Sequence, residues 1–384
     1  MNLKGRGAGM KIGVDVRALY LPNMKGIGIY LKNLLSAISE IDSGSEFHLY
    51  YDGRQQVVKR KPAPERFIEK ELIIPKGDTF YFWEQFKLPS QLRKEKLDVF
   101  HSPANTTFLM KSCPVVVTVH DTTVQEIAHG SFVKELYFKK VQPFLLRKAE
   151  KIIAPSNSSK NNIVNILKVD PEKVVVIYQG LNQRFRVIND PEAVEGTKTK
   201  LGIAGPYILF TGGESVWKNI SRLIEAYAML KRRNKISEKL IVTGIRSQEI
   251  LAKHMREIER LKITSDVSVL GYLNEDDLVS LYNGARVFVY PSLKEGFGFP
   301  PLEAMACGVP VAASNAASIP EVVGEAALLF DGENIENMSD VLFKTLTDKE
   351  TRSQLIAKGF GRVRQFTWEK TARETIAIYK EFSK

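Results

Sequence analysis

Short apolar runs alternate with longer amphipathic stretches along most of this chain. The runs at residues 207–211 and 287–290 are rich in Ile, Leu, Val and Phe and have almost no charge. The stretches between such runs repeat apolar residues every three or four positions, as at residues 29–38 and 248–261. Apolar strands that alternate with amphipathic helices predict βαβ units and parallel sheets.

The predicted elements form two groups, separated by residues 189–206, whose mixture of Pro, Gly, Thr and charged residues predicts a linker. The strands of the first group are predicted at residues 11–16, 47–51, 99–100, 115–119, 152–154 and 174–177, and those of the second at 207–211, 240–243, 267–270, 287–290 and 311–313. The helices are predicted at residues 29–38, 156–167, 220–231, 248–261, 275–283 and 301–307, with further helices from about residue 335 onward.

The chain length of 384 residues favours two domains over one. We therefore predict an α/β protein of two doubly wound, Rossmann-like parallel-sheet domains with an interdomain cleft at the carboxyl ends of the strands. The domains are placed at residues 1–190 and 191–366. The last helix, residues 367–384 with Thr367 as its cap, either crosses back to the first domain or stays with the second.

Positive charge is concentrated in the first half of the chain, which carries +10 in residues 1–190 against +1 in the remainder. This imbalance predicts an anionic partner, either acidic lipid, a phosphorylated acceptor or nucleic acid. Two stretches, residues 80–88 and 134–151, combine aromatic residues with lysines, as in helices that lie on an anionic membrane surface, although ordinary core helices can look the same.

Three further features concern the compartment. No apolar run is long enough to span a membrane, and the first residues lack the apolar core of a signal peptide. The two cysteines, Cys113 and Cys307, have neither metal-binding nor disulfide spacing. We therefore predict a cytoplasmic protein that binds peripherally to the inner face of the plasma membrane.

Candidate chemistry is densest in the segment KEGFGFPPLEAMACGVPV, residues 294–311. Glu295 and Glu303 flank a Gly/Phe/Pro turn, with seven residues between them. Pro300 and Pro301 suit the first turn of a helix, where a missing N–H group costs nothing, and Gly308 suits the residue after its end. A helix that begins in such a loop presents unpaired backbone N–H groups, which bind phosphate. The segment predicts a site for a phosphorylated sugar compound, with carboxylates for its hydroxyl groups.

A second glycine-rich turn, residues 211–219, lies between a predicted strand and a predicted helix. Glycine there lets a ligand approach the backbone closely. Lys218 can neutralise a diphosphate whose negative charge grows as it leaves. Lysine at a helix start opposes the helix dipole, which favours a functional role for Lys218 over a solvated one.

These motifs resemble those of retaining nucleotide-sugar glycosyltransferases of the GT-B fold, the glycosyltransferase family 4 (group 1) type. The resemblance covers most of the chain and is strongest over residues 207–321. It implies that Glu295 contacts the transferred sugar and that Glu303 holds the ribose. The family usually has an Arg-Lys pair where this chain has Trp217 and Lys218. It also implies that no metal or other cofactor is needed.

Further residues gain roles from the same resemblance. Gly26 and Gly28 look superficially like a dinucleotide fingerprint, but Leu31 replaces the third glycine, so a loop near the donor phosphates fits better. His120 follows a strand and is expected near the donor sugar, oriented by Asp121, while His101 and Asn105 are weaker candidates for acceptor contact. The predicted catalytic residues are Glu295, His120 and Lys218. The predicted donor-binding residues are Gly26, Gly28, Gly213, Lys218, Asn219, Gly271, Tyr272, Gly296, Phe297, Gly298, Phe299 and Glu303.

The resulting hypothesis is a hexosyltransferase of bacterial surface polysaccharide synthesis. Its donor would be GDP-mannose, dTDP-rhamnose or a UDP-sugar, and its acceptor a hydroxyl group of a glycan or a lipid-linked oligosaccharide. Three alternatives remain open at this point. They are a nucleotide-sugar epimerase of the same fold, a glycogen-phosphorylase-like enzyme, which usually has a far longer chain, and a non-catalytic basic nucleic-acid-binding module. No nucleic acid is expected as a partner of the transferase.

Overall fold

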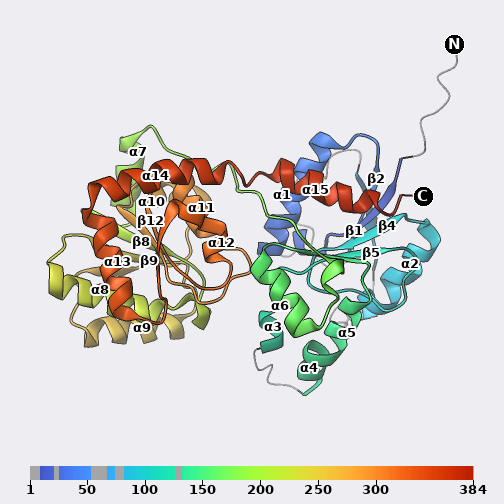
Figure 1. Ribbon diagram of the computed structural model, residues 1–384, viewed down its shortest axis with the longest axis horizontal. Coiled ribbons are helices and arrows are strands. Elements are labelled where there is room, and N and C mark those ends of the chain that lie inside the picture. Colours follow the sequence, from blue (N-terminus) through green and yellow to red (C-terminus); the bar gives the residue numbers. More distant parts are fainter. Residues whose placement is uncertain (1–8, 21–25, 53–66, 74–81, 127–131, 384) are drawn as a thin grey trace, which may run out of the picture. The chain divides into compact units, whose positions relative to one another are not determined.

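A computed structural model of the 384-residue chain describes residues 9–20, 26–52, 67–73, 82–126 and 132–383. The chain divides into two compact units (Figure 1). Unit 1 comprises Met1–Gly180 together with Thr367–Lys384, and unit 2 comprises Leu181–Phe366. The chain leaves unit 1 after Gly180 and returns to it at Thr367, so the last helix belongs to unit 1.

Within the described residues, unit 1 contains a seven-stranded parallel sheet in the order β3-β2-β1-β4-β5-β6-β7. Its strands are β1 (Lys11–Asp15), β2 (Glu46–Tyr51), β3 (Phe67–Glu71), β4 (Val99–Ser102), β5 (Val115–Thr118), β6 (Lys151–Ala154) and β7 (Val174–Val176). The order reverses direction at β1, next to β4. In such sheets ligands bind beyond the carboxyl ends of the strands at this point.

The helices of unit 1 cover both faces of its sheet. They are α1 (Gly26–Ile41), α2 (Leu88–Glu95), α3 (Thr123–Glu126), α4 (Phe132–Leu136), α5 (Gln142–Arg147), α6 (Asn157–Leu167) and α15 (Trp368–Lys380). Short 3₁₀ or π turns join them: η1 (Arg17–Leu19), η2 (Trp83–Lys87), η3 (Tyr137–Val141) and η4 (Pro171–Lys173). Each face of the sheet has its own hydrophobic core, and alternate residues of β2 point into one or the other. Leu49 packs with α1 and α15, whereas Tyr50 packs with α2.

Helix α15 lies beside α1 in Figure 1 and is held within unit 1 by buried contacts. Thr367 is its N-cap, and the Thr367 hydroxyl accepts a hydrogen bond from the Lys370 N–H group. Tyr379 is fully buried, and its hydroxyl lies 2.6 Å from Nδ1 of His101 on β4. Burial also lowers the pKa of His101 to about 3, so this imidazole is neutral.

Unit 2 contains a six-stranded parallel sheet in the order β10-β9-β8-β11-β12-β13. Its strands are β8 (Tyr207–Thr211), β9 (Lys239–Thr243), β10 (Val267–Val269), β11 (Val287–Tyr290), β12 (Val311–Ser314) and β13 (Ala327–Phe330). Its helices and turns are α7 (Pro191–Lys200), η5 (Val216–Lys218), α8 (Ile220–Asn234), α9 (Gln248–Arg260), α10 (Glu275–Asn283), α11 (Phe299–Ala306), α12 (Ile319–Val323), η6 (Gly324–Ala326), α13 (Ile335–Thr347) and α14 (Lys349–Val363).

The sequence pattern missed the edge strands β3 and β13 and the helices α3, α7 and α12. β3, at an edge of the seven-stranded sheet, was missed because only Phe67 of its five residues is buried. β13, at an edge of the six-stranded sheet, was missed because Leu328 and Leu329 remain partly exposed. The predicted linker contains α7, which has little apolar periodicity. Asp190 caps α7 through the N–H groups of residues 192 and 193, and the Lys200 ammonium contacts Asp277 of α10 at 2.7 Å. Local capping and tertiary contact therefore replace the missing apolar face.

Candidate functional site

Lys218 and Glu295 meet at the carboxyl end of the unit 2 sheet, in the loops that follow β8 and β11. The Lys218 ammonium donates to Oε1 of Glu295 at 2.6 Å and to the Tyr290 hydroxyl at 3.0 Å. The same oxygen also accepts from the hydroxyls of Tyr290 (2.7 Å) and Ser292 (2.5 Å). Within the described part of the chain, the other oxygen of Glu295 accepts no hydrogen bond. Glu295 is thus firmly oriented, and one of its oxygens is left for a ligand.

Glu303 lies in the second turn of α11 beside the same loops. Its Oε2 accepts a hydrogen bond of 2.8 Å from the buried hydroxyl of Tyr282, which in turn lies 2.9 Å from the Thr211 hydroxyl. Burial raises the pKa of Glu303 to about 7, against the lowering effects of Tyr282 and of the Lys218 charge. Its carboxyl group therefore changes charge near neutrality, where it can act as donor or acceptor.

The loop that leads into α11, residues 296–299, differs from the predicted phosphate seat in one respect. The helix begins at Phe299, two residues earlier than predicted, with Gly298 as N-cap at φ +100°. Pro300 and Pro301 therefore occupy first-turn positions and remove two of the N–H groups that a helix start normally offers. Gly298 and Phe299, which precede these prolines, keep their backbone N–H groups at the helix start, and a phosphate seat at this loop stays a prediction.

A buried serine fixes that loop. The Ser318 hydroxyl is the donor in contacts with the carbonyl oxygens of Glu295 (3.0 Å) and Phe297 (2.8 Å). The Phe297 ring is buried and packs edge-on against Phe299, with 5.0 Å between their centroids. The Phe297 ring is therefore part of the packing of this loop and is closed to a ligand.

Three glycine loops lie together at the ends of β8, β9 and β10. The Gly212 N–H group donates to Thr243 O, and the Gly244 N–H group donates to Gly271 O. A Cβ atom on Gly244 would lie 2.0 Å from Gly212 O, so no larger residue fits there. The predicted donor residues Gly213 and Gly271 border this packed junction, and a Cβ at Gly213 would meet no atom within 4 Å. The space above Gly213 is thus open to a ligand.

Asn219 and Tyr272 occupy different surroundings from each other. Asn219 is buried in the left-handed conformation, and its amide donates to Pro291 O (3.1 Å) and Gly332 O (2.7 Å). Its side chain therefore ties these loops together, and contact between Asn219 and the donor stays a prediction. Tyr272 is 68% exposed and carries the Arg246 guanidinium 4.0 Å from its ring centroid, a pairing that the sequence motifs did not indicate.

In unit 1, His120 is held by groups other than the predicted Asp121. Its Nε2–H group donates to Pro103 O at 3.0 Å, and its Nδ1 accepts from the Gln179 amide at 3.1 Å. Asp121 instead accepts from the N–H group of Thr123. Burial lowers the pKa of His120 and so favours the neutral imidazole, and the two hydrogen bonds select the tautomer with the proton on Nε2. The imidazole is therefore fixed, and the hypothesis that Asp121 orients it is wrong.

Other predicted residues of unit 1 are structural in this conformation. The His101 imidazole is fully buried between Tyr379 and Thr118, so it is not accessible for acceptor contact. Asn105 supports His120 by accepting its backbone N–H at 2.7 Å. Gly26 and Gly28 lie inside the first turns of α1 and not in a loop; Lys25 is outside the described residues.

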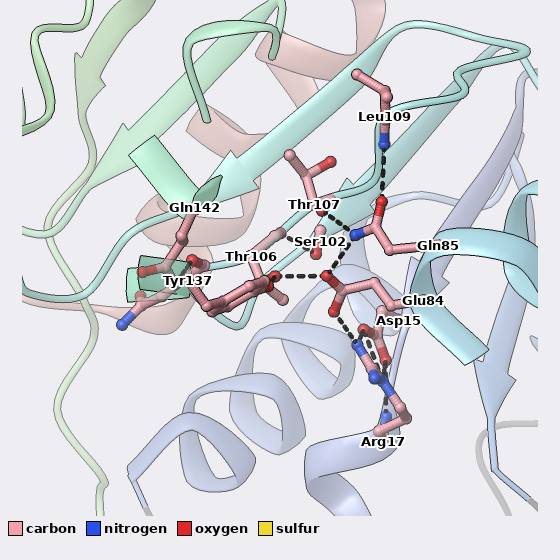
Figure 2. Close-up of polar contacts among 11 residues, drawn as sticks. Asp15, Arg17, Glu84, Gln85, Ser102, Thr106, Thr107, Leu109, Tyr137 and Gln142 are labelled. Atoms are coloured by element: carbon pink, nitrogen blue, oxygen red, sulfur yellow. Dashed lines mark hydrogen bonds and ion pairs between the residues drawn. The ribbon is translucent and has the colours of Figure 1, made fainter. Parts of the chain in front are cut away.

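A buried polar network at the ends of β1 and β4 was not predicted (Figure 2). The Arg17 guanidinium contacts Asp15 at 2.6 Å and Glu84 at 3.0 Å, and the other Glu84 oxygen accepts from the Thr106 hydroxyl at 2.6 Å. The hydroxyls of Thr106 and Tyr137 lie 3.3 Å apart. Burial raises the pKa of Glu84, but Arg17 and Thr106 favour its charged form. The members of this network are too widely spaced in sequence to form a motif.

The Figure 2 network joins three segments that expose apolar side chains. Glu84 and Tyr137 come from the π turns η2 and η3, and Gln85 fastens the loop of Thr107 and Leu109. The exposed apolar side chains on these segments are Phe82, Phe86, Leu109, Met110, Phe132, Val133, Leu136, Val141 and Phe144. Exposed basic residues accompany them at Lys134, Lys139, Lys140, Arg147 and Lys148. We call these fourteen residues together the apolar-basic group. Phe80 and Tyr81 of the predicted stretch lie outside the described residues.

No group of three or more His, Cys, Asp or Glu side chains in the described ranges could hold a metal ion. No helix found there is both long and apolar enough to cross a membrane.

Two parallel α/β sheets in tandem, with acidic and basic groups at the carboxyl ends of their strands, define a protein of the GT-B class. Solved structures agree in fold. Anabaena Alr3699/HepE, in complex with UDP and glucose, matches with a TM-score of 0.74 and 17% identity over 97% of this chain and 100% of that chain. WaaG, a glycosyltransferase involved in lipopolysaccharide biosynthesis, matches with a TM-score of 0.71 and 16% identity over 96% of this chain and 99% of that chain.

Sequence comparison gives the family. Residues 197–362 match the model of glycosyl transferases group 1, and residues 24–185 match that of Glycosyltransferase Family 4. The O-antigen chain mannosyltransferase B of Escherichia coli is 32% identical over 75% of this chain and 76% of its own length. The serotype-specific mannosyltransferase WbdA of Escherichia coli is 31% identical over 63% of this chain, and the match covers 30% of the length of WbdA. The chain belongs to glycosyltransferase family 4, as the motifs around Lys218 and Glu295 predicted.

Proposed function

We propose that this protein transfers a hexose, with retention of anomeric configuration, from a nucleoside-diphosphate sugar to a hydroxyl group of a glycan or lipid-linked oligosaccharide in bacterial surface polysaccharide synthesis. The observation that carries the proposal is the Lys218–Glu295 pair beside Glu303 in unit 2. A cation, an oriented carboxylate and a second carboxylate in one group of loops suit a ligand with a diphosphate between two hydroxyl-bearing sugars.

Lys218, Glu295 and Glu303 each have one role in the proposed mechanism. Lys218 and the amides of residues 296–299 stabilise the departing diphosphate. Glu295 keeps its three internal donors on one oxygen and uses the other to accept a hydrogen bond from the transferred sugar. Glu303 binds the ribose hydroxyls. The leaving phosphate oxygen takes the proton of the attacking hydroxyl on the same face, so the site needs no separate general base and no metal.

Among the possible donors, GDP-mannose has the most support, because several relatives of this chain, the two Escherichia coli proteins among them, are mannosyltransferases. The side chains near the expected position of the nucleotide base do not discriminate strongly between guanine, uracil and thymine. Backbone groups around Gly271 and the flat Arg246–Tyr272 pair suit a planar ring of any base. dTDP-rhamnose and UDP-sugars therefore remain candidate donors and are included in the experiment described below.

The acceptor side is assigned to unit 1, which we propose to bind peripherally to the anionic inner face of the plasma membrane. The apolar-basic group combines exposed rings with lysines, the composition that binds an anionic bilayer. Exchange of Phe132 and Val133, which are 81% and 73% exposed, for serine should reduce sedimentation with phosphatidylglycerol vesicles but not activity on a soluble acceptor. Equal sedimentation of both forms would contradict this assignment.

The donor assignment is tested by thermal unfolding with GDP-, UDP- and dTDP-sugars, followed by product analysis. A true donor should raise the unfolding temperature of the wild type but not of Glu303→Gln, because binding to the folded state stabilises it. With acceptor, the product should carry the anomeric configuration of the donor. A changed sugar formed from donor alone would instead establish an epimerase, and no stabilisation by any of the three would refute the donor site.

A further inference from the structure

The Glu295 carboxylate is held by groups of two kinds. One is the ammonium of Lys218, which lies 2.6 Å from Oε1 at the end of a long side chain that is 19% exposed. The others are the hydroxyl groups of Tyr290 and Ser292, at 2.7 and 2.5 Å from the same oxygen, and both of these residues are fully buried. The ammonium can therefore move toward a ligand, whereas the hydroxyl groups stay in place.

The two hydroxyl groups are fixed by β11 and the turn that follows it. Tyr290 is the last residue of β11, and its ring lies nearly parallel to that of Phe288, with 6.0 Å between the centroids. The Ser292 carbonyl accepts a hydrogen bond from the buried Ser314 hydroxyl of β12. Side chains that are packed in this way on a strand hold the groups around them to a defined geometry.

Tyr290 contacts both charged groups of the site. Its hydroxyl accepts from the Lys218 ammonium at 3.0 Å and donates to Glu295, so it bridges the two. Burial, together with the neighbouring Glu295 carboxylate, raises the pKa of Tyr290 well above its ordinary value. The phenol therefore keeps its proton and remains a donor to Glu295 across the neutral range.

A departing diphosphate changes the balance between these donors. Its negative charge grows as the sugar leaves, so it attracts Lys218 more strongly in the transition state than in the bound donor. The contact between Lys218 and Glu295 then weakens at the step in which the position of the carboxylate matters most. A carboxylate held by Lys218 alone would lose its orientation at that step, whereas donors that the diphosphate does not attract preserve it.

We propose that the hydroxyl groups of Tyr290 and Ser292 are positioning groups for the transfer, which hold Glu295 toward the transferred sugar while Lys218 stabilises the leaving diphosphate. This inference rests on the proposed function. The two hydroxyl groups contribute more in the transition state than in the donor complex, where Lys218 still supports the carboxylate. Their loss therefore lowers kcat and leaves the KM for the donor nearly unchanged.

The test measures initial rates of nucleoside diphosphate release from GDP-mannose, dTDP-rhamnose or UDP-glucose, whichever the wild type cleaves, with water or mannose oligosaccharides as acceptor. Tyr290→Phe keeps the ring and should lower kcat by about tenfold to a hundredfold, the range for a lost hydrogen bond to a charged group. The KM for the donor should change by less than about threefold. Ser292→Ala should show the same pattern.

Coupling to Glu295 separates positioning from a purely structural role. In a Glu295→Gln background the charged acceptor is gone, so Tyr290→Phe should lower kcat further by no more than about threefold. A purely structural hydroxyl group would lower kcat by the same factor in both backgrounds, and this result would overturn the inference.

Tyr227→Phe is the matched control, because it also removes a buried hydroxyl group of unit 2, one that lies 2.8 Å from Glu238 O at the amino end of β9. It should leave kcat and KM unchanged. Circular dichroism and the unfolding temperature verify the fold of every variant, and Ser292→Ala carries the test if Tyr290→Phe does not fold. Full kcat in folded Tyr290→Phe and Ser292→Ala would overturn this inference alone. A wild type that cleaves none of the three donors would overturn the donor site together with it.

Discussion

Both units place charged side chains at the carboxyl ends of parallel strands, but the two groups are built for different tasks. In unit 1, Asp15, Arg17 and Glu84 are 3%, 11% and 8% exposed at their side chains and satisfy one another, with Thr106, in a closed network. In unit 2, Lys218 and Glu295 are 19% and 15% exposed. The comparison suggests that the first group holds a surface in shape, whereas the second can exchange an internal partner for a ligand.

The largest effect is expected from Arg17→Met. Removal of the guanidinium leaves the carboxylates of Asp15 and Glu84 buried without a cation, which typically costs about 3–5 kcal/mol. Urea unfolding followed by tryptophan fluorescence should detect this loss, because the Arg17 guanidinium lies 4.2 Å from the Trp83 ring centroid. The double variant with Glu84→Gln should recover part of the stability. A loss below about 1 kcal/mol would mean that this network is not the support inferred here.

The next effect concerns activity. Glu295→Gln keeps the size of the side chain but removes its charge, and we expect kcat to fall by about 10²–10³-fold, as when one oriented electrostatic group is lost from an active site. Initial rates with saturating donor measure this. Glu325→Gln, at a surface position paired with Lys358, is the control and should retain full activity. Unchanged kcat in Glu295→Gln would remove this residue from the mechanism.

A pH effect of about 1–3 kcal/mol is expected at Glu303. Burial raises its pKa from 4.5 to about 7, so the folded protein keeps a proton that the unfolded chain has released. Between these values the folded state binds more protons, and this residue makes stability fall as pH rises from about 4.5 to 7. Chemical unfolding across this range should show a flatter pH profile for Glu303→Gln than for wild type. Parallel profiles would contradict the burial of this carboxyl group.

The smallest effect is expected from Tyr379→Phe in unit 1. The change leaves Nδ1 of the buried His101 without its 2.6 Å partner and should cost about 1–2 kcal/mol. Tyr272→Phe, which removes an exposed hydroxyl from unit 2, is the control and should change stability by less than about 0.5 kcal/mol. If both variants unfold at the same denaturant concentration, the hydrogen bond between α15 and β4 does not stabilise unit 1.

Most of the fold could be predicted because its strands are buried on both faces and read as continuous apolar runs. β8, β11 and α10 have the predicted limits, and α11 starts only two residues early. The misses are elements whose stability comes from context. α7 depends on the Asp190 cap and on Asp277, and β3 depends on pairing with β2 because its own residues are mostly polar.

The candidate site was predictable to the extent that it is local in sequence. Glu295, Glu303 and Lys218 lie in two short motifs, and the structure brings the loops of both together. The Figure 2 network could not be predicted in this way, because Arg17, Glu84 and Tyr137 are far apart in the chain and are joined only by folding. The same holds for the Gln179 contact that orients His120.

A crystal structure with the bound nucleoside diphosphate that best stabilises the protein tests the central claim most directly. We predict that the diphosphate lies against the Lys218 ammonium and the amides of residues 296–299, with the ribose on Glu303 and Glu295 free to contact a sugar. A nucleotide bound elsewhere, with the Lys218–Glu295 contact of 2.6 Å unchanged, would contradict the account.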